Sequence, residues 1–164
     1  MAECWLVITA GATVALVFVT GLFLYMQNRT FRKQLKASLQ LQMEDRFFFN
    51  PHMLAARKKL AEQIWSEAPH RVVQESIMNF FDTMGSFLRR NYLDKELICS
   101  SFSWYGTRWW TACKDYIEEE NRTKVGGPFF EDFRKLVITF KEEGEIEPSP
   151  ADIQDFLTEE KIVE

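Results

Sequence analysis

The feature that most restricts this chain is a run of 22 uncharged residues near its start, WLVITAGATVALVFVTGLFLYM, from Trp5 to Met26. At about 1.5 Å per residue, a helix of this length reaches roughly 33 Å, which matches the hydrocarbon core of a bilayer. We therefore expect a transmembrane helix over residues 5–26, preceded by a short extracytoplasmic N-terminus over residues 1–4. Trp5 and Tyr25 stand near its two ends, where amphipathic rings favour the membrane interface.

A cleaved signal peptide is the alternative for this segment. Such peptides have a basic start, a shorter apolar region and a small-residue cleavage site. This chain instead opens with MAEC and closes its apolar run with Tyr25, Met26 and Gln27. The sequence therefore favours an uncleaved signal-anchor that spans the membrane once.

The flanks of the apolar run differ in charge. Four basic residues follow it closely: Arg29, Arg32, Lys33 and Lys36. The other flank offers only Glu3 and the terminal amine, so the positive-inside rule places the N-terminus outside the inner (plasma) membrane and residues 27–164 in the cytoplasm. At about 100° per residue the four basic side chains share one helix face. They either bind anionic lipid or only set the topology, and both interpretations stay open.

The part of the chain that follows has uneven charge. Residues 27–141 carry 19 Lys or Arg against 14 Asp or Glu, a net charge of +5, while residues 142–164 carry nine acids and one Lys, a net charge of −8. The basic residues are dispersed among acids, so the sequence predicts no nucleic-acid partner. An acidic tail of this charge favours a docking role towards a basic surface.

Hydrophobic residues beyond the apolar run recur at three and four, and no alternating strand pattern of useful length is present. We expect an all-α fold in which the transmembrane helix is followed by a juxtamembrane linker helix over residues 27–49 and an antiparallel cytoplasmic bundle over residues 50–143. An acidic tail with a short helix follows over residues 144–164. About four to five helices are expected, near residues 51–66, 71–90, 94–121, 128–143 and 149–159.

Helix boundaries have specific signals. Asn50 is suited to cap a helix that has Pro51 at its first position. Asp94 is a cap for the helix near residues 94–121, and Ser149 with Asp152 resembles a capping box that opens the short tail helix.

The aromatic cluster WYGTRWW, residues 104–110, is divided by helical geometry. Tyr105 and Trp109 fall on the stripe predicted to be buried, whereas Trp104 and Trp110 flank it. Arg108 is one turn from Trp104, close enough to stack on the indole. These flanking residues either pack at the shoulders of the bundle or, together with the apolar side of the tail helix, form a partner surface. That predicted surface consists of Trp104, Arg108, Trp110, Ile153, Phe156 and Leu157.

No catalytic or metal-binding signature stands out. The chain has two histidines, 18 residues apart, and no CxxC or HExxH spacing. The histidine nearest to either Cys99 or Cys113 is about thirty residues away, and both cysteines are predicted to be free, buried thiols. We predict no catalytic residue, no metal and no cofactor, and expect the protein not to be an enzyme.

The apolar run also contains a small-xxx-small pair, Gly11 and Ala15. Such pairs allow two membrane helices to approach closely. Homo-oligomerisation through this pair is an open alternative to a single copy in the membrane.

Four segments carry a resemblance to a known family: ARKKL at 56–60, IMNFFDTMGSFLRRNYLDKELI at 77–98, WWTACKDYIEEENR at 109–122 and FFEDFRKL at 129–136. With the N-terminal span, they resemble a domain-of-unknown-function family of small bacterial single-span membrane proteins with a cytoplasmic helical domain. The resemblance covers roughly residues 1–140 and brings no site residue with it. The acidic tail lies beyond it.

The leading functional hypothesis is a single-pass, membrane-anchored scaffold or regulatory protein-interaction module without catalytic activity. Its expected partners are the lipid bilayer and a protein. One alternative is a small-ligand sensor or an enzyme with a pocket near residues 104–110. Another is an accessory subunit of a membrane transporter or channel, which differs from the first hypothesis only in the identity of the partner.

Overall fold

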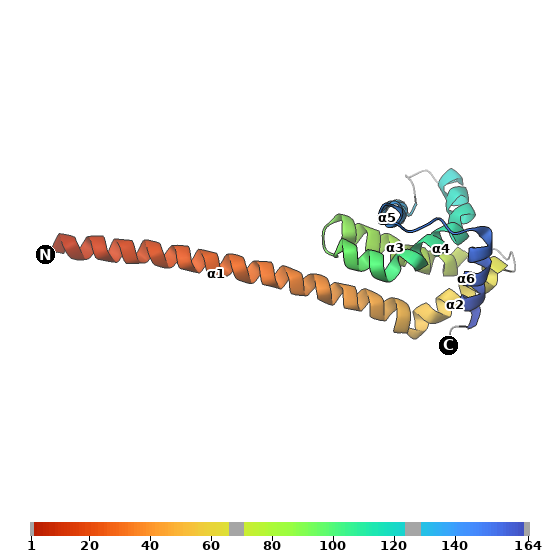
Figure 1. Ribbon diagram of the computed structural model, residues 1–164, viewed down its shortest axis with the longest axis horizontal. Helices are drawn as coiled ribbons and strands as arrows, with labels where there is room; N and C mark the ends of the chain where they lie inside the picture. The colour runs from red at the N-terminus through yellow and green to blue at the C-terminus, as the bar shows by residue number, and fades with distance from the viewer. Residues whose placement is uncertain (1, 66–70, 124–128, 163–164) are drawn as a thin grey trace. The chain divides into compact units, whose positions relative to one another are not determined.

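The computed structural model describes residues 2–65, 71–123 and 129–162, and of residues 2–15, 71–74, 120 and 123 only the backbone. All regular structure in these ranges is helical, which confirms the predicted all-α class. Figure 1 labels the α-helices: α1 (Ala2–Glu44), α2 (Pro51–Trp65), α3 (Arg71–Arg89), α4 (Lys95–Thr123), α5 (Glu131–Glu142) and α6 (Pro150–Ile162). The π-helix η1 (Asp45–Phe49) lies between α1 and α2 in the chain.

The chain forms two compact units, residues 1–37 and residues 38–164. The first unit is the N-terminal part of α1, which joins the predicted span and the start of the predicted linker helix without a break. The predicted span begins with residues 5–15, Trp5 among them, whose side chains lie outside those described. Among the residues with described side chains, no helix combines the length and the hydropathy that a membrane crossing requires.

The predicted linker helix ends in an unexpected way. α1 stops at Glu44 and one π-helical turn, η1, follows before Asn50. The wider turn places Phe47 fully in the core and leaves Phe49 72% exposed. This part of the predicted linker therefore belongs to the second unit.

The predicted capping residues act as expected. The Asn50 side chain accepts hydrogen bonds from the backbone N–H groups of His52 and Met53 at 2.9 and 3.3 Å, and so starts α2. At the start of α6, the Asp152 carboxylate accepts from the Ser149 N–H and hydroxyl at 2.8 and 2.7 Å, and Ser149 Oγ accepts from the Asp152 N–H at 3.3 Å. The reciprocal pair confirms the capping box.

The core of the second unit is rich in large aromatic side chains. Trp109, on the predicted stripe of α4, is completely buried, as is Phe102, and Tyr105 of the same stripe is half-buried. The same core contains rings from η1, α3, α5 and α6, of which the fully buried ones are Phe47, Phe81, Phe133, Phe140 and Phe156. Ring pairs in this core adopt stacked and edge-to-face geometries, which orient the helices more specifically than aliphatic packing would.

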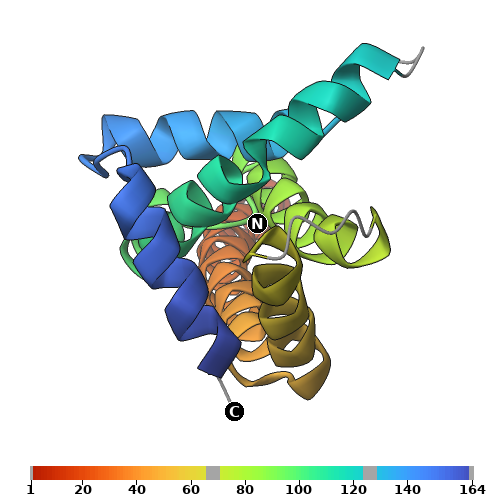
Figure 2. The ribbon, with the colours of Figure 1, turned by 90° about the vertical axis from the view of Figure 1, so that its right-hand side faces the viewer.

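The arrangement of α5 departs from the antiparallel bundle predicted for residues 50–143. Figure 1 shows α5 nearly end-on while α3 lies along the plane of the picture, and Figure 2 shows α5 side-on, so the two helices cross steeply. Gly85 in α3 makes this crossing close, because a Cβ there would overlap the backbone of Asp132. Side-chain periodicity reports which face of a helix is buried but not the angle at which it crosses its neighbour.

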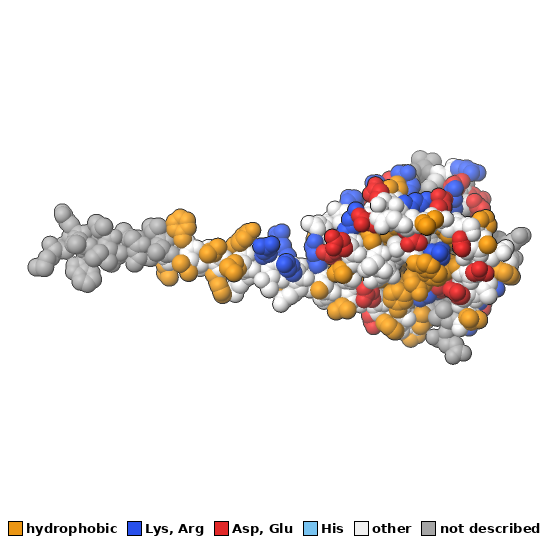
Figure 3. All heavy atoms as spheres, in the orientation of Figure 1, with side chains coloured by type: hydrophobic (Ala, Val, Ile, Leu, Met, Phe, Trp, Pro, Cys, Tyr) orange, Lys and Arg blue, Asp and Glu red, His pale blue; other side chains and the backbone are white. Residues whose placement is uncertain are grey.

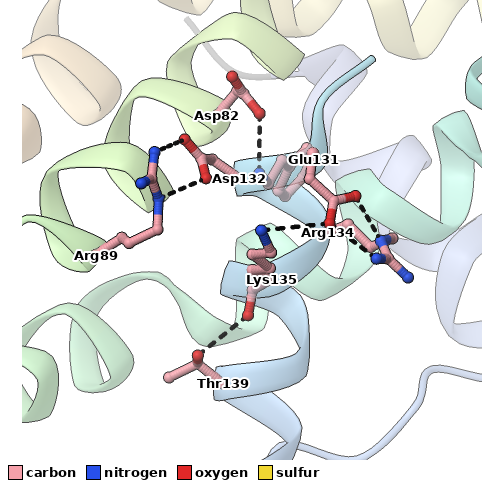
Figure 4. Close-up of polar contacts among 8 residues, drawn as sticks. Asp82, Arg89, Glu131, Asp132, Arg134, Lys135 and Thr139 are labelled. Atoms are coloured by element: carbon pink, nitrogen blue, oxygen red, sulfur yellow. Dashed lines mark hydrogen bonds and ion pairs between the residues drawn. The ribbon is translucent and has the colours of Figure 1, made fainter. Parts of the chain in front are cut away.

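Polar contacts fix the start of α5 on α3 (Figure 4). The Asp82 carboxylate accepts a hydrogen bond from the Phe133 N–H at 3.0 Å, and Arg89 forms two parallel hydrogen bonds of 3.0 Å with Asp132. Phe130, at the N-cap position, has a left-handed backbone and no side-chain cap of its own. α3 therefore supplies the acceptor that the first turn of α5 needs.

Candidate functional site

The most specific polar contact in the second unit lies beneath α6. The guanidinium of Arg57, in α2, donates to the carboxylate of Glu160, in α6, through Nε at 2.8 Å and Nη2 at 2.6 Å. The remaining nitrogen Nη1 donates to the Phe47 carbonyl of η1 at 3.1 Å. Both side chains are almost completely buried, with 4% and 3% of their surface exposed.

Aromatic rings surround this ion pair. The Arg57 guanidinium carbon lies 4.5 Å from the centre of the Phe47 ring and 5.2 Å from that of Tyr105. These rings exclude water from the guanidinium, so the buried cation needs an anion close by. Removing one partner of a buried ion pair destabilises a protein by about 3–5 kcal/mol, because the other charge is left unpaired. The site therefore demands a carboxylate opposite Arg57.

Phe156 is the apolar anchor of α6. Its ring meets those of Trp109 and Trp104 edge-on, with centroids 4.9 and 5.3 Å apart. Leu157 beside it is 4% exposed, and Ile153, one turn earlier, is half-buried. We call the surface that receives α6 the α6 groove, and define it by Phe47, Arg57, Trp104, Tyr105 and Trp109.

One edge of the groove carries a second, more exposed polar cluster. The Arg108 guanidinium stacks on Trp104 at 4.2 Å from the ring centre, as the sequence spacing predicted. It also pairs with Glu145, just before α6, at 3.3 Å, and Glu145 accepts a hydrogen bond from Ser103 at 3.0 Å. Figure 3 shows hydrophobic side chains gathered where α4 and α6 run, with a basic side chain among them.

The far end of α6 is held from outside the groove. The Lys161 ammonium lies 3.8 Å from the centre of the Trp65 ring, and Trp65 is 53% exposed. Solvent reaches this contact, so it contributes less than the buried Arg57–Glu160 pair to the choice of occupant.

Trp110 is separate from the rest of the predicted partner surface. Its ring packs edge-on against Phe133 of α5 at 5.1 Å between centroids. It lines a cavity of about 330 Å³ between α4 and the start of α5, together with Lys114, Ile117, Glu118, Asn121, Phe129, Glu131 and Arg134. The size is at the lower end of small-molecule sites.

The predicted membrane-facing residues belong to the first unit. Tyr25 is 68% exposed, Arg29, Arg32 and Lys33 are exposed, and Lys36 is half-buried. Figure 3 shows apolar side chains along this part of α1 followed by a basic cluster, which is the order that the sequence predicted.

The two thiols of the second unit are free and buried, as predicted. Burial raises the pKa of Cys113 to about 12. Burial, and then the nearby Glu143 carboxylate, raise the pKa of Cys99 as well. Among the residues with described side chains, no three of His, Cys, Asp or Glu cluster as metal ligands would.

The profile of a domain of unknown function, DUF4760, matches residues 5–140. This chain belongs to the DUF4760 family. The predicted resemblance to a domain-of-unknown-function family is thereby confirmed, whereas its bacterial and single-span attributes stay predictions. No curated protein and no solved structure matches the chain.

The boundary of the DUF4760 match divides the site. All the residues that define the α6 groove lie within residues 5–140, whereas α6 and the segment before it lie beyond the match. The groove is therefore built from the family domain and is filled by a segment outside it.

Sequence reasoning missed the charged centre of the groove in this DUF4760 protein, although a signal was present. Arg57 lies four residues after Met53 and three before Leu60, on the apolar stripe of α2. Glu160 lies four residues after Phe156 on the apolar side of α6. A cation and an anion on two otherwise apolar helix faces indicate a buried pair, because neither can be buried without a partner.

Proposed function

We propose that this DUF4760 protein is a membrane-anchored, non-enzymatic helical module that binds another protein, as a scaffold or regulator. The observation that carries the anchoring is the exposure of the apolar side chains of α1. Nine large ones between residues 16 and 26 are 58–76% exposed: Leu16, Val17, Phe18, Val19, Leu22, Phe23, Leu24, Tyr25 and Met26. Continuous apolar surface of this kind is rarely left in water.

The charge pattern supports an orientation. Three exposed basic residues, Arg29, Arg32 and Lys33, follow the apolar stretch within a few residues, and Glu3 is the charged side chain on the other side. In the proposed topology, the N-terminus is extracytoplasmic and the second unit lies in the cytoplasm at the inner membrane. The basic residues then lie close to anionic headgroups and contribute about 1 kcal/mol each if they reach the surface.

The interaction role is supported by the α6 groove. It combines the buried cation Arg57, the more exposed cation Arg108 at its edge and the aromatic side chains between them. Together these groups favour helices of matching charge and shape over other apolar surfaces. Interfaces that use tryptophan, tyrosine and arginine in this way concentrate their binding energy in few residues.

Anchoring and orientation are tested with the protein's own cysteines. Because Cys99 and Cys113 are buried, a membrane-impermeant maleimide added to intact cells should label only Cys4, and Cys4→Ser should abolish labelling. An Asp115→Cys variant, exposed on α4, should be labelled only after the membrane is opened. Release of the protein from membranes at pH 11, or labelling of Asp115→Cys from outside, would overturn the proposed topology.

The partner is sought by crosslinking in native membranes, followed by identification of what co-purifies. A regulatory or scaffold role expects a protein partner, and recovery of a transporter or channel subunit would place the chain as an accessory subunit. Crosslinks between copies of the chain would assign a role to Gly11 and Ala15 in self-association. If no partner is crosslinked from any exposed face, the interaction role fails.

The cavity beside Trp110 supports a second candidate, a small-ligand sensor. Its wall joins an aromatic face to basic and acidic side chains, a mixture suited to a small zwitterionic or aromatic molecule. A thermal-shift screen of metabolites would test this, with Trp110→Ala as the variant that should lose any response. If no compound changes the melting temperature, the sensor candidate fails and only the interaction role is left.

A further inference from the structure

Building on the proposed interaction role, we propose that α6 stands in for a helix of a partner protein. The α6 groove is then a receptor for an acidic amphipathic helix that carries an aromatic residue and, four residues later, a glutamate. In the resting chain α6 fills the groove with Phe156 and Glu160, and the partner helix displaces it.

The groove specifies its occupant by chemistry as well as by shape. Arg57 is buried against two adjoining aromatic rings, so a helix without a carboxylate at this point would leave the cation unpaired. The guanidinium uses two nitrogens for the carboxylate, which fixes the direction from which the acid approaches. Trp104 and Trp109 receive an aromatic ring one helical turn away.

α6 is built as a separable segment. Gly144 has a left-handed backbone with φ of +103°, and no regular structure is present between it and Pro150. The Ser149–Asp152 capping box starts α6 from residues of its own segment, so the helix does not depend on a preceding helix for its first turn. At 13 residues α6 is too short to be stable in water, and the groove supplies most of its stability.

Two ion pairs beside the connecting segment are weak, whereas Glu145 of this segment pairs with Arg108 at the groove edge and Pro148 is buried. The Lys141–Glu147 and Lys95–Glu143 pairs are exposed to solvent, with 41–69% and 42–46% of their side-chain surface accessible. Exposed pairs of this kind add little to stability. The buried contacts of α6 itself lie in the groove, where a competing helix would act, and Glu145 and Pro148 hold the segment before it.

Among the described residues, α6 also leaves one hydrogen-bond donor of the groove without an acceptor. Trp109 contacts the Phe156 ring and is fully buried, yet within the described part of the chain its indole N–H has no hydrogen-bond acceptor. A helix that brings an acceptor to this ring would gain a hydrogen bond that α6 does not make.

The DUF4760 match gives an independent reason to treat groove and occupant as separate. It includes Arg57, Trp104 and Trp109 and ends at residue 140, before the segment that leads into α6. The receptor surface is thus part of the family domain, and this chain fills it with an added helix.

Tethering sets the threshold for displacement. A helix on a short linker is present at a local concentration on the order of millimolar. A free helix must therefore bind well or be concentrated near the groove, for example by anchoring in the same membrane. The resting chain stays closed, and partners that meet either condition open it.

The test uses the full chain and a labelled peptide with the sequence of residues 147–162. Glu160→Gln in the chain weakens the tethered helix, so the peptide should bind this variant at least ten-fold more tightly than the wild-type chain. Glu159→Gln in the chain is the matched control, because Glu159 is exposed on α6 beside Glu160, and it should leave the affinity at the wild-type level.

The peptide is varied in the same way. A Glu160→Gln peptide should bind the Glu160→Gln chain at least ten-fold more weakly than the unaltered peptide, and a Glu159→Gln peptide should bind like the unaltered one. Equal binding of all three peptides would remove Arg57 as the determinant and overturn the assignment. If the Glu160→Gln chain does not fold, Phe156→Ala in the chain replaces it, with the same expected gain for the peptide.

Hydrogen exchange on the unaltered chain needs no variant. Amides of α6 should exchange at least ten-fold faster than those in the middle of α3, because α6 opens while the rest stays folded. Equal protection of α6 and α3 would make α6 a permanent part of the core and overturn the proposal. A dimer that forms when the wild-type chain is mixed with the Glu160→Gln chain would place the wild-type copy's α6 in the groove of the variant, which also overturns a partner helix.

These measurements are independent of membrane anchoring and partner capture. Failure of peptide exchange would leave the topology and crosslinking results untouched, whereas failure of crosslinking would remove the interaction role even if the peptide binds.

Discussion

Gly85 of α3 lies directly against the backbone carbonyl of Asp132 in α5, with no room between them for a methyl group. The position is buried, and its neighbour is main chain, which cannot rotate away as a side chain can. The steep crossing of α3 and α5 in Figures 1 and 2 depends on this approach. One hydrogen atom in place of a side chain thus positions α5.

Gly85→Ala should destabilise the second unit by about 3 kcal/mol, because α5 must move before the added methyl group fits. Alanine favours a helix over glycine by about 1 kcal/mol, so the measured loss is the net of these opposed effects. Urea unfolding followed by the far-ultraviolet circular dichroism signal would measure it.

Gly106→Ala is the graded comparison for this prediction. Its Cβ would lie 2.5 Å from the Phe140 Cε2 atom, which belongs to a side chain that can shift more readily than main chain, and we expect a smaller loss of about 1–2 kcal/mol. Gly21→Ala, where nothing lies within 4 Å, should leave the unfolding of the second unit unchanged. A loss at Gly106 larger than that at Gly85 would contradict the distinction between backbone and side-chain obstruction.

The buried Arg57–Glu160 pair should be more important for specificity than for stability. Either single change, Arg57→Met or Glu160→Leu, strands a buried charge and should cost about 3–5 kcal/mol. The double change removes both charges and replaces them with apolar side chains of similar length, so it should cost less than either single change. The free energies of unfolding of the wild-type chain, the two single variants and the double variant form a double-mutant cycle, which measures the interaction between the two side chains.

A double variant whose loss equals the sum of the two single losses would show that the residues act independently, contrary to the 2.6 Å contact. Glu159→Gln is the control and should change the free energy of unfolding by no more than about 0.5 kcal/mol, because its side chain is exposed.

Local signals in the sequence were sufficient for the helices of the second unit. Asn50, Pro51, Ser149 and Asp152 mark where α2 and α6 begin, and the apolar spacing of α4 identified Trp109 as buried. These features depend on neighbours within one or two turns, which sequence spacing reports directly.

What the sequence did not predict depends on contacts between distant residues. Arg57 and Glu160 are 103 positions apart, and the crossing at Gly85 depends on the approach of a helix 47 residues later. The π-turn at Asp45–Phe49 also escaped prediction, because the same aromatic residues fit an ordinary helical turn. Trp104 and Trp110 were grouped as one surface, yet they contact α6 and α5 respectively.

The start of α5 should respond to acid. The hydrogen bonds from Arg89 hold the pKa of Asp132 below its ordinary value, with smaller contributions from Lys135 and Ser86. Because the pKa is lower in the folded state, the ionised carboxylate stabilises the folded chain at pH values above the unfolded pKa of about 3.9. This stability is lost as the pH falls through the folded-state pKa. Asp132→Asn should therefore be less stable than wild type by about 0.5–1 kcal/mol at pH 7, and the difference should shrink as the pH falls below the unfolded pKa.

Urea unfolding of both chains between pH 2 and 7 checks this. Arg89→Gln should show the same reduced dependence on pH, because it removes the other member of the pair in Figure 4. Asp155→Asn, which alters an exposed carboxylate of α6, should follow wild type. A constant gap between wild type and Asp132→Asn at every pH would mean that the ionised carboxylate is not the source of the stability.

Cys113 should not react with alkylating reagents in the folded chain. Its pKa of about 12 leaves about one thiolate in ten thousand at pH 8, and its side chain is 2% exposed, so both the reactive form and access to it are limited. In a Cys4→Ser background, iodoacetamide at pH 8 should leave Cys113 unmodified while Cys99, which is 8% exposed, reacts slowly. Mass spectrometry of tryptic peptides distinguishes the two sites. In concentrated urea both should be alkylated at the rate of a free thiol, and alkylation of folded Cys113 at that same rate would mean that α4 does not pack as described.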